Sequence, residues 1–300
     1  MSEVAEFLDV VEIVTSEDDV PALEELVLGL GYDVSSYCNV ETHVGHTYIV
    51  AEDGAQAAEI ASAVQAMLPD WNDCLTEPVR SVSCIRMARE DWAESWKRFF
   101  HAFRASNRLV VKPSWEEYTA QPGDLILELD PGMSFGTGHH GTTKACLKFL
   151  DELQAQEGAM SMLDAGTGSG ILAIGAHLLG YSPVRAFDYD PQAVLTATEN
   201  LEKSGWLAST ELIEADVTAK VPLEPSRVVV ANILAPVLMA SAENILSLVD
   251  RSQGGYLVLS GILTEQYPEV RDCFVKLGAK ELSSRKIDEW TSGLFAVPQK

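Results

Sequence analysis

Long hydrophobic runs are absent from this chain. Although 47% of its 300 residues are hydrophobic, no apolar stretch approaches the roughly 18–20 residues of a membrane-spanning helix. The N-terminus, from Met1 to Glu6, is acidic and lacks the basic region that precedes the apolar stretch of a secretory signal. We therefore expect a globular cytoplasmic protein with a large core, long enough for two domains.

Cysteine is also scarce. Five cysteines are scattered along the chain, and none belongs to a Cys-x-x-Cys pair. An odd, scattered set does not provide the framework of a disulfide-stabilised secreted domain, nor does it have the spacing of a zinc site. We predict reduced thiols that serve mostly in packing: Cys38, Cys74, Cys84, Cys146 and Cys273.

Basic residues are outnumbered by acidic ones. The chain has 21 lysines and arginines against 45 aspartates and glutamates, which gives a formal charge of −24. The phosphates of DNA or RNA would be repelled, so a general nucleic-acid-binding protein is excluded. An acidic surface that attracts a basic protein partner explains this excess. A generally acidic proteome or an adaptation for solubility explains it as well.

The most informative segment is the glycine-rich run from Leu163 to Gly170, between an apolar lead-in and an apolar stretch that predicts a buried helix. A strand, a glycine-rich turn and a helix open a nucleotide-type α/β fold. A dinucleotide site has the spacing G-x-G-x-x-G, but Ile171 occupies its third glycine position. The pattern that starts at Asp164, Asp-x-Gly-x-Gly-x-Gly, instead resembles that of S-adenosylmethionine (AdoMet) methyltransferases. A tight strand-to-helix connection without a ligand is the alternative.

Two acids downstream support the AdoMet interpretation. Asp188 ends the predicted strand Val184–Asp188, about 20 residues after the turn, where a carboxylate accepts hydrogen bonds from ribose hydroxyls. Asp216 falls where such folds approach the adenine. Asp190 is a rival for the ribose role, but Asp190 followed by Pro191 is more typical of a helix start.

The first 88 residues have a pattern of their own. Alternating, β-branched segments predict four strands, and helical spacing predicts two helices, the second of which ends before Pro69. The order βαββαβ is that of a ferredoxin-like α+β domain. We predict a substrate-recognition domain over residues 1–88, with a purely structural cap as the alternative. The predicted elements are Phe7–Thr15, Asp19–Leu30, Tyr32–Val40, Val44–Ala51, Gly54–Leu68 and Val79–Met87.

Residues 89–120 are predicted to link the domains, through an aromatic-striped helix over Glu90–Phe103 and a connecting strand over Leu109–Val111. Residues 121–300 are predicted to form an α/β, Rossmann-like AdoMet-dependent methyltransferase domain. Two closing strands after the last helix fit the antiparallel seventh strand that is typical of such enzymes. The later elements are predicted over Val228–Ala231, Tyr256–Ser260, Glu265–Leu277, Lys280–Ile287 and Gly293–Val297.

One segment is more specific than any fold element. Asp130 to Thr143 resembles the Asp-Pro-Gly-x-x-Phe-Gly-Thr-Gly-x-His-x-Thr-Thr segment of the PrmA family, whose members methylate ribosomal protein L11. Three further segments agree with that family: Asp91 to His101, Lys112 to Glu116, and Val230 to Ala235. The chain departs from the family pattern at His139, where Thr is usual, and at Gly141, where Pro is usual.

The resemblance implies a set of AdoMet-binding residues. Asn232 would lie beside the methyl group and act as the catalytic residue, and Asp188 would bind the ribose. A loop with Phe135, Gly136 and Thr137 would close over the methionine end. The full set of cofactor-binding residues that the resemblance implies is Phe135, Gly136, Thr137, Thr143, Gly166, Gly168, Asp188 and Asn232.

The resemblance also implies the reaction, which is methyl transfer to lysine side chains and to the N-terminal amine of L11, a basic protein. Deprotonating a lysine at pH 7 costs roughly 4–5 kcal/mol, and desolvation supplies part of it. Asn232 would orient the amine. His139 and His140 are candidate bases, or simply loop and helix-cap residues. The alternatives are a lysine methyltransferase for another basic protein and a non-catalytic AdoMet-binding ribosome-assembly factor.

Overall fold

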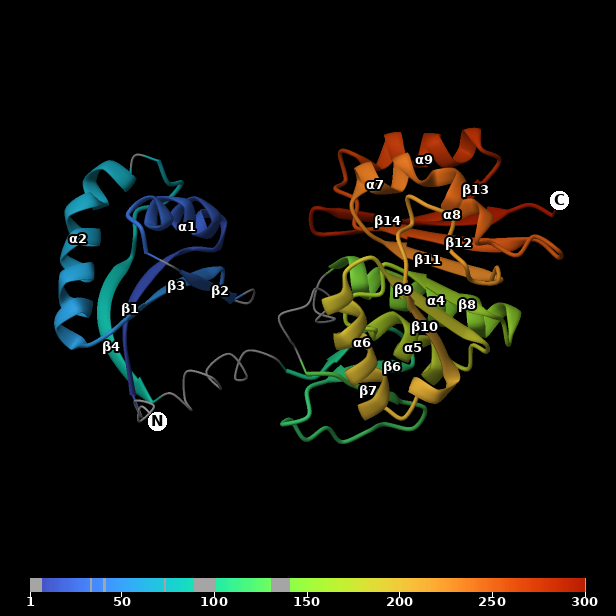
Figure 1. The fold of residues 1–300 in the computed structure, drawn as a ribbon, viewed down its shortest axis with the longest axis horizontal. Helices are drawn as coiled ribbons and strands as arrows, with labels where there is room; N and C mark the ends of the chain where they lie inside the picture. The colour runs from blue at the N-terminus through green and yellow to red at the C-terminus, as the bar shows by residue number, and fades with distance from the viewer. Residues whose placement is uncertain are drawn as a thin grey trace. The chain divides into compact units, whose positions relative to one another are not determined.

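Two compact units make up the chain, Met1–Phe100 and His101–Lys300 (Figure 1). The structure is a computed structural model, and it describes residues 7–32, 34–39, 42–72, 74–88, 101–130 and 141–299. None of the helices in these ranges has the length and apolar character needed to cross a membrane.

The first unit is a four-stranded antiparallel sheet with two helices. Its order along the chain, βαββαβ, and its sheet order, β2-β3-β1-β4, are those of a ferredoxin-like domain, as predicted. Val11, Ile13 and Ile49 on the sheet pack with both helices in one core. The elements are β1 (Phe7–Ser16), a 3-10 turn (Glu17–Asp19), α1 (Val20–Gly29), β2 (Ser35–Asn39), β3 (Val44–Ala51), α2 (Gly54–Asn72) and β4 (Ser81–Ala88).

The prediction that α2 ends before Pro69 is wrong, because the helix continues through Pro69 to Asn72. A proline inside a helix removes one backbone hydrogen bond and crowds the preceding turn. Pro69 lies on the exposed side of α2, whereas Trp71 in the last turn is only 4% exposed and joins the core. Burial of this large aromatic side chain holds the last turn in place despite the proline.

The second unit is built on a seven-stranded sheet with the order β10-β9-β8-β11-β12-β14-β13. All neighbouring strands are parallel except β14, which is antiparallel to both β12 and β13. The prediction of a Rossmann-like α/β unit with an antiparallel seventh strand is therefore confirmed. The strands are β8 (Met162–Ala165), β9 (Val184–Asp188), β10 (Thr210–Glu214), β11 (Val228–Asn232), β12 (Gly255–Ser260), β13 (Lys280–Ile287) and β14 (Trp290–Val297).

Helices cover both faces of this sheet (Figure 1). One core joins α4 and α5 to strand residues such as Met162 and Val230, and the other joins α7, α8 and α9 to residues such as Leu163 and Ala231. Consecutive strand residues thus face opposite cores, as expected for a central parallel strand. The helices are α4 (Gly141–Glu157), α5 (Ile171–Leu179), α6 (Pro191–Lys203), α7 (Ala235–Ala240), α8 (Ala242–Ser247) and α9 (Tyr267–Lys276).

A small third sheet begins the second unit: β5 (Phe103–Arg104), β6 (Leu109–Lys112) and β7 (Leu125–Glu128). We predicted the domain boundary at residue 121, with a linker over residues 89–120. The structure instead includes the segment from His101 onward in the second unit. Leu109 and Val111 are 0% and 2% exposed in the same core as α4 and α5. Most of the predicted helix Glu90–Phe103 lies outside the described residues, and its last residue starts β5.

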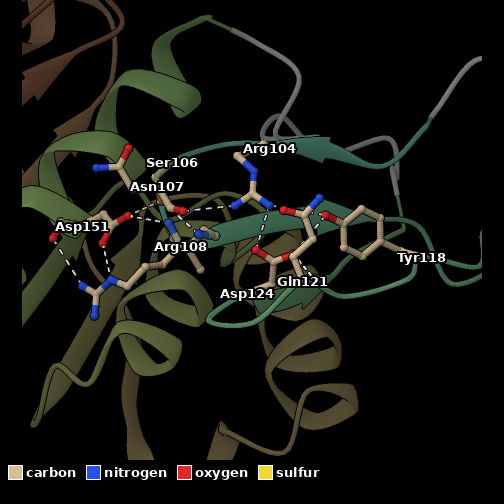
Figure 2. A network of polar contacts seen from close by, with 9 residues as sticks. Arg104, Ser106, Asn107, Arg108, Tyr118, Gln121, Asp124 and Asp151 are labelled. Carbon is tan, nitrogen blue, oxygen red and sulfur yellow. Dashed lines mark hydrogen bonds and ion pairs between the residues drawn. The ribbon is translucent and has the colours of Figure 1, made fainter.

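A polar network ties this small sheet to α4 (Figure 2). The Asp151 carboxylate accepts hydrogen bonds from Ser106 Oγ at 2.6 Å, from Arg108 N at 2.9 Å and from Arg108 Nε at 2.6 Å. Burial alone would raise the pKa of Asp151, but the hydrogen bonds from Ser106 and Arg108 outweigh burial and lower it. Arg104, the last residue of β5, and Tyr118 donate hydrogen bonds to Asp124, which directly precedes β7.

We expect Asp151→Asn to destabilise the second unit by roughly 2 kcal/mol, because it removes a buried carboxylate from a half-exposed ion pair and leaves donors of Ser106 and Arg108 poorly paired. Denaturant unfolding measures this change. Asp272→Asn is the matched control, since Asp272 is exposed and forms a surface ion pair with the adjacent Arg271. Equal stability of the two variants would contradict a structural role for the network.

Candidate active site

The glycine-rich turn between β8 and α5 needs its glycines for conformational reasons. Gly166, Gly168 and Gly170 have φ angles of +77°, +55° and +81°, a region that side chains with a Cβ rarely adopt. A Cβ at Gly166 would also collide with the side chain of Ile233, which follows β11. The turn therefore brings bare backbone to the carboxyl end of the sheet, beside the end of β11.

Asp188, the last residue of β9, holds this turn in place. Its Oδ2 accepts a hydrogen bond from Gly168 N at 2.9 Å, and its Oδ1 accepts one from Asp190 N at 3.1 Å. The residue is only 6% exposed. Asp190 has a different role: it is the N-cap of α6 and accepts from Gln192 N at 2.9 Å, as its sequence context predicted. The carboxylate that faces the glycine turn is thus Asp188.

Asp164, the acid of the glycine motif, lies under the turn. It is fully buried, and its Oδ2 accepts a hydrogen bond from Thr167 Oγ1 at 2.7 Å. Burial raises the pKa of Asp164 to about 7, and the nearby negative charge of Asp188 adds to this rise. A cationic ligand above the turn would favour the ionised carboxylate. The electrostatics of the turn therefore suit a cation and disfavour an anion.

A cavity of about 560 Å³ opens at the carboxyl ends of β8 and β11. Here the strand order reverses, and such switch points are where open α/β sheets bind ligands. Tyr189 and Leu234 line the cavity with side chains that are largely exposed, at 74% and 67%. The lining residues are Gly166, Phe187, Tyr189, Ala215, Asp216, Val217, Thr218, Asn232, Ile233, Leu234, Val237, Gly261 and Trp290.

Besides Asp164, whose Oδ1 has no partner in the described part of the chain, two polar residues near the end of the sheet have a buried oxygen that is unused. Asn232, the last residue of β11, lines the cavity, and its buried Oδ1 has no hydrogen-bond partner in the described part of the chain. Thr143, in the first turn of α4, is fully buried, and its Oγ1 also has no partner there. Buried polar atoms are rarely left unpaired, so such atoms indicate a ligand or an ordered water.

The predicted site residues fall into four groups. Gly166, Asn232 and the adenine candidate Asp216 line the cavity. Gly168 and Asp188 adjoin it through the hydrogen bond that shapes the turn, whereas Thr143 is not among the lining residues. Phe135, Gly136 and Thr137, with both candidate histidines, lie outside the described residues.

Sequence reasoning left several lining residues unassigned. Tyr189 directly follows the acid of β9, so its place after a carboxyl strand end was a usable signal. Gly261 follows β12 in the same way, with φ +79°, and a Cβ there would approach Ile233 O to 2.5 Å. Trp290 begins β14 from the opposite direction, so only the antiparallel pairing brings it to this edge.

These residues fit AdoMet. Apolar walls formed by Phe187, Val217 and Val237 suit an adenine ring, and ligand pockets of this size combine such walls with a few polar groups. The unused Oδ1 of Asn232 is an acceptor for an N–H donor. Acids beneath and beside the turn suit a cationic sulfonium.

Comparisons with known proteins agree with this geometry. Residues 21–296 match the model of the family described as ribosomal protein L11 methyltransferase (PrmA). The ribosomal protein L11 methyltransferase of Geotalea daltonii is 44% identical over 221 residues, which are 70% of this chain and 69% of that protein. The one from Geobacter metallireducens is 41% identical over 236 residues, which are 79% and 75% of the two chains.

A solved structure extends the agreement to the fold. The crystal structure of ribosomal protein L11 methylase from Lactobacillus delbrueckii subsp. bulgaricus has a TM-score of 0.60 and 29% identity. The match covers 67% of this chain and 100% of that one. The resemblance that the segment from Asp130 to Thr143 predicted is thus confirmed, and the chain belongs to the ribosomal protein L11 methyltransferase family.

Proposed function

We propose that this protein transfers methyl groups from AdoMet to amino groups of ribosomal protein L11, namely lysine side chains and the N-terminal amine. The observation that carries the proposal is the unused, buried Oδ1 of Asn232 in a cavity beside the glycine turn. Membership of the L11 methyltransferase family supports both the reaction and the substrate. The acidic charge of −24 suits a basic acceptor in the cytoplasm.

AdoMet, when bound, supplies a methyl group that is attached to a positively charged sulfur. After transfer of the methyl group, this sulfur is left as a neutral thioether. The protein has to present the acceptor amine in its neutral form. Trp290, Leu234 and Val237 give the cavity apolar walls, and an amine that loses water against such walls has a lowered pKa. Asn232 Oδ1 then accepts an N–H of the amine and turns its lone pair toward the methyl carbon.

The remaining roles follow from position. Asp188 accepts one backbone hydrogen bond from the turn, at Gly168, and one from Asp190, and a carboxylate retains acceptor capacity beyond two such bonds. We assign that capacity to the ribose hydroxyls. Gly166 and Gly168 allow close approach of the ligand to the backbone, and Thr143 offers a hydroxyl from α4. Phe135, Gly136 and Thr137 stay predicted contacts to the methionine end.

The substrate is tested by incubating the full chain with purified L11 and AdoMet labelled in its methyl group. We expect label on L11, at amines that mass spectrometry identifies. The rate at limiting L11 should fall with added salt, because part of the encounter is electrostatic. Label on another basic protein of a lysate, but not on L11, would replace L11 as the substrate. Binding of AdoMet without any protein labelling would show a non-catalytic factor.

We expect Asn232→Ala to reduce turnover more than it weakens AdoMet binding, because its proposed partner is the reacting amine as well as the cofactor. Loss of one oriented hydrogen bond in the transition state predicts a fall in kcat of roughly 100-fold. Steady-state kinetics and calorimetry separate the two effects. Gln253→Ala is the control, since Gln253 is an exposed amide outside the cavity. An unchanged kcat in Asn232→Ala would remove this residue from catalysis.

Asp188 and Asp190 provide a matched pair for AdoMet binding. Asp188→Ala removes a charged acceptor, which is worth roughly 1.5–3 kcal/mol, so we expect AdoMet to bind roughly 10- to 100-fold more weakly. Asp190→Ala removes only the cap of α6, which lowers stability by about 1 kcal/mol and leaves affinity close to that of the wild type. Calorimetric titration with AdoMet gives both values. The reverse ranking would assign the ribose to Asp190.

A further inference from the structure

The sheet of the first unit has two chemically different faces. Side chains alternate along a strand, so the neighbours of the core residues Val11, Ile13 and Ile49 point away from both helices. These neighbours include Glu12 on β1 and Tyr48 on β3, which are paired across the strands. Most of the core of the unit lies on the helix side, and the other side carries polar and aromatic groups.

Four residues on that second side form a continuous cluster, which we call the aromatic–acidic face: Glu12, Tyr37, His46 and Tyr48. Tyr37 on β2 is paired with His46 on β3, and their ring centroids are 6.5 Å apart. His46 stacks on Tyr48 at 6.2 Å with an interplanar angle of 13°. His46 Nδ1 lies 3.0 Å from Glu12 Oε1, which completes the cluster.

The aromatic–acidic face is partly open to solvent. The side chains of Glu12 and His46 are 22% and 25% exposed, and Tyr37 and Tyr48 are also of intermediate exposure. Val50, two residues beyond Tyr48 on the same side of β3, is 48% exposed. Val10 on β1, which is paired with Val50 and lies on the same side, is fully buried, so the accessible part of this side lies toward β2 and β3.

Charge decides which class of partner such a face suits. Aromatic rings on an open sheet of this topology stack on RNA bases in other proteins, but those proteins also supply positive charge for the phosphates. Residues 1–100 hold 20 of the 45 acidic residues and 5 of the 21 basic ones, a formal charge of −15. A carboxylate, that of Glu12, lies within the cluster itself. The face therefore suits a cation and repels a phosphate backbone.

We propose that the aromatic–acidic face docks a lysine- or arginine-bearing segment of the protein acceptor. A guanidinium or ammonium group binds over the faces of Tyr37 and Tyr48 by cation–π attraction, while Glu12 supplies the counter-charge. The proposal rests on the proposed function only in that the acceptor is a basic protein. It adds the surface that holds this acceptor, which belongs to the first unit, whereas the cavity where the amine reacts belongs to the second unit.

The test compares full-length variants for binding to fluorescently labelled L11 without AdoMet, and for KM and kcat in methylation. Tyr37→Leu keeps apolar bulk but removes the ring, and Tyr37→Phe restores the ring. We expect Tyr37→Leu and Glu12→Gln to raise Kd and KM for L11 by roughly 3- to 30-fold. Turnover at saturating L11 and the affinity for AdoMet should stay within twofold of the wild type, and Tyr37→Phe should behave like the wild type.

Glu59→Gln is the matched control, because Glu59 lies exposed on α2 of the same unit. This substitution removes the same charge as Glu12→Gln. An equal rise in KM for Glu59→Gln would overturn a specific face in favour of general charge attraction. Unchanged values in both Tyr37→Leu and Glu12→Gln would also overturn the proposal, and Glu12→Gln decides alone if Tyr37→Leu fails to fold. Binding of a labelled oligouridine strand that depends on Tyr37 would assign the face to RNA.

The same design separates the two proposals. If the wild type binds L11 through the aromatic–acidic face but does not methylate it, docking stands and the proposed function fails. If L11 is methylated with a KM that ignores both variants, the proposed function stands and docking on this face fails.

Discussion

The hydrogen bond from Gly168 N to Asp188 Oδ2 is the constraint on which the site depends. It joins the ends of β8 and β9 through a turn that three left-handed glycines make possible. The turn lies against Ile233, so the end of β11 is placed by the same contact. Backbone donors, a carboxylate and the side chain of Asn232 thus meet at one edge of the sheet, where the strand order reverses.

The same turn collects negative charge at some cost in stability. Asp164 is fully buried and lies close enough to Asp188 for the second charge to raise its pKa further. Two carboxylates in such a position destabilise the free protein when both are ionised. A cationic ligand at the turn would compensate this repulsion. The two acids would then contribute more in the ligand-bound state than in the free one, which is the condition for selective binding.

Much of this arrangement could be predicted from the sequence, because it depends on local signals. The glycine pattern, the strand end at Asp188 and the cap at Asp190 are each readable within a few residues. The continuation of α2 past Pro69 could not be predicted in this way, because it depends on the burial of Trp71 by distant residues. The position of Trp290 at the cavity could not be predicted either, because it depends on the pairing of β14 with β12. About half of the predicted cofactor-binding residues line or adjoin the cavity in the described residues, and all of them stay predictions as cofactor contacts.

An amine methyltransferase faces two opposed requirements. A basic acceptor is attracted by negative charge, yet its amine reacts only when it is neutral. The first unit has a charge of −15 and an aromatic–acidic face suited to a cation. The cavity has mostly apolar walls, with the amide oxygen of Asn232 proposed for the reacting amine and the carboxylate of Asp216 proposed for the adenine. An acid placed at the reacting amine would stabilise the ammonium form and raise its pKa. Placing the aromatic–acidic face in one unit and mostly apolar walls around the reacting amine in the other reduces that conflict, because attraction of the substrate then does not require an acid at the nitrogen that must lose its proton.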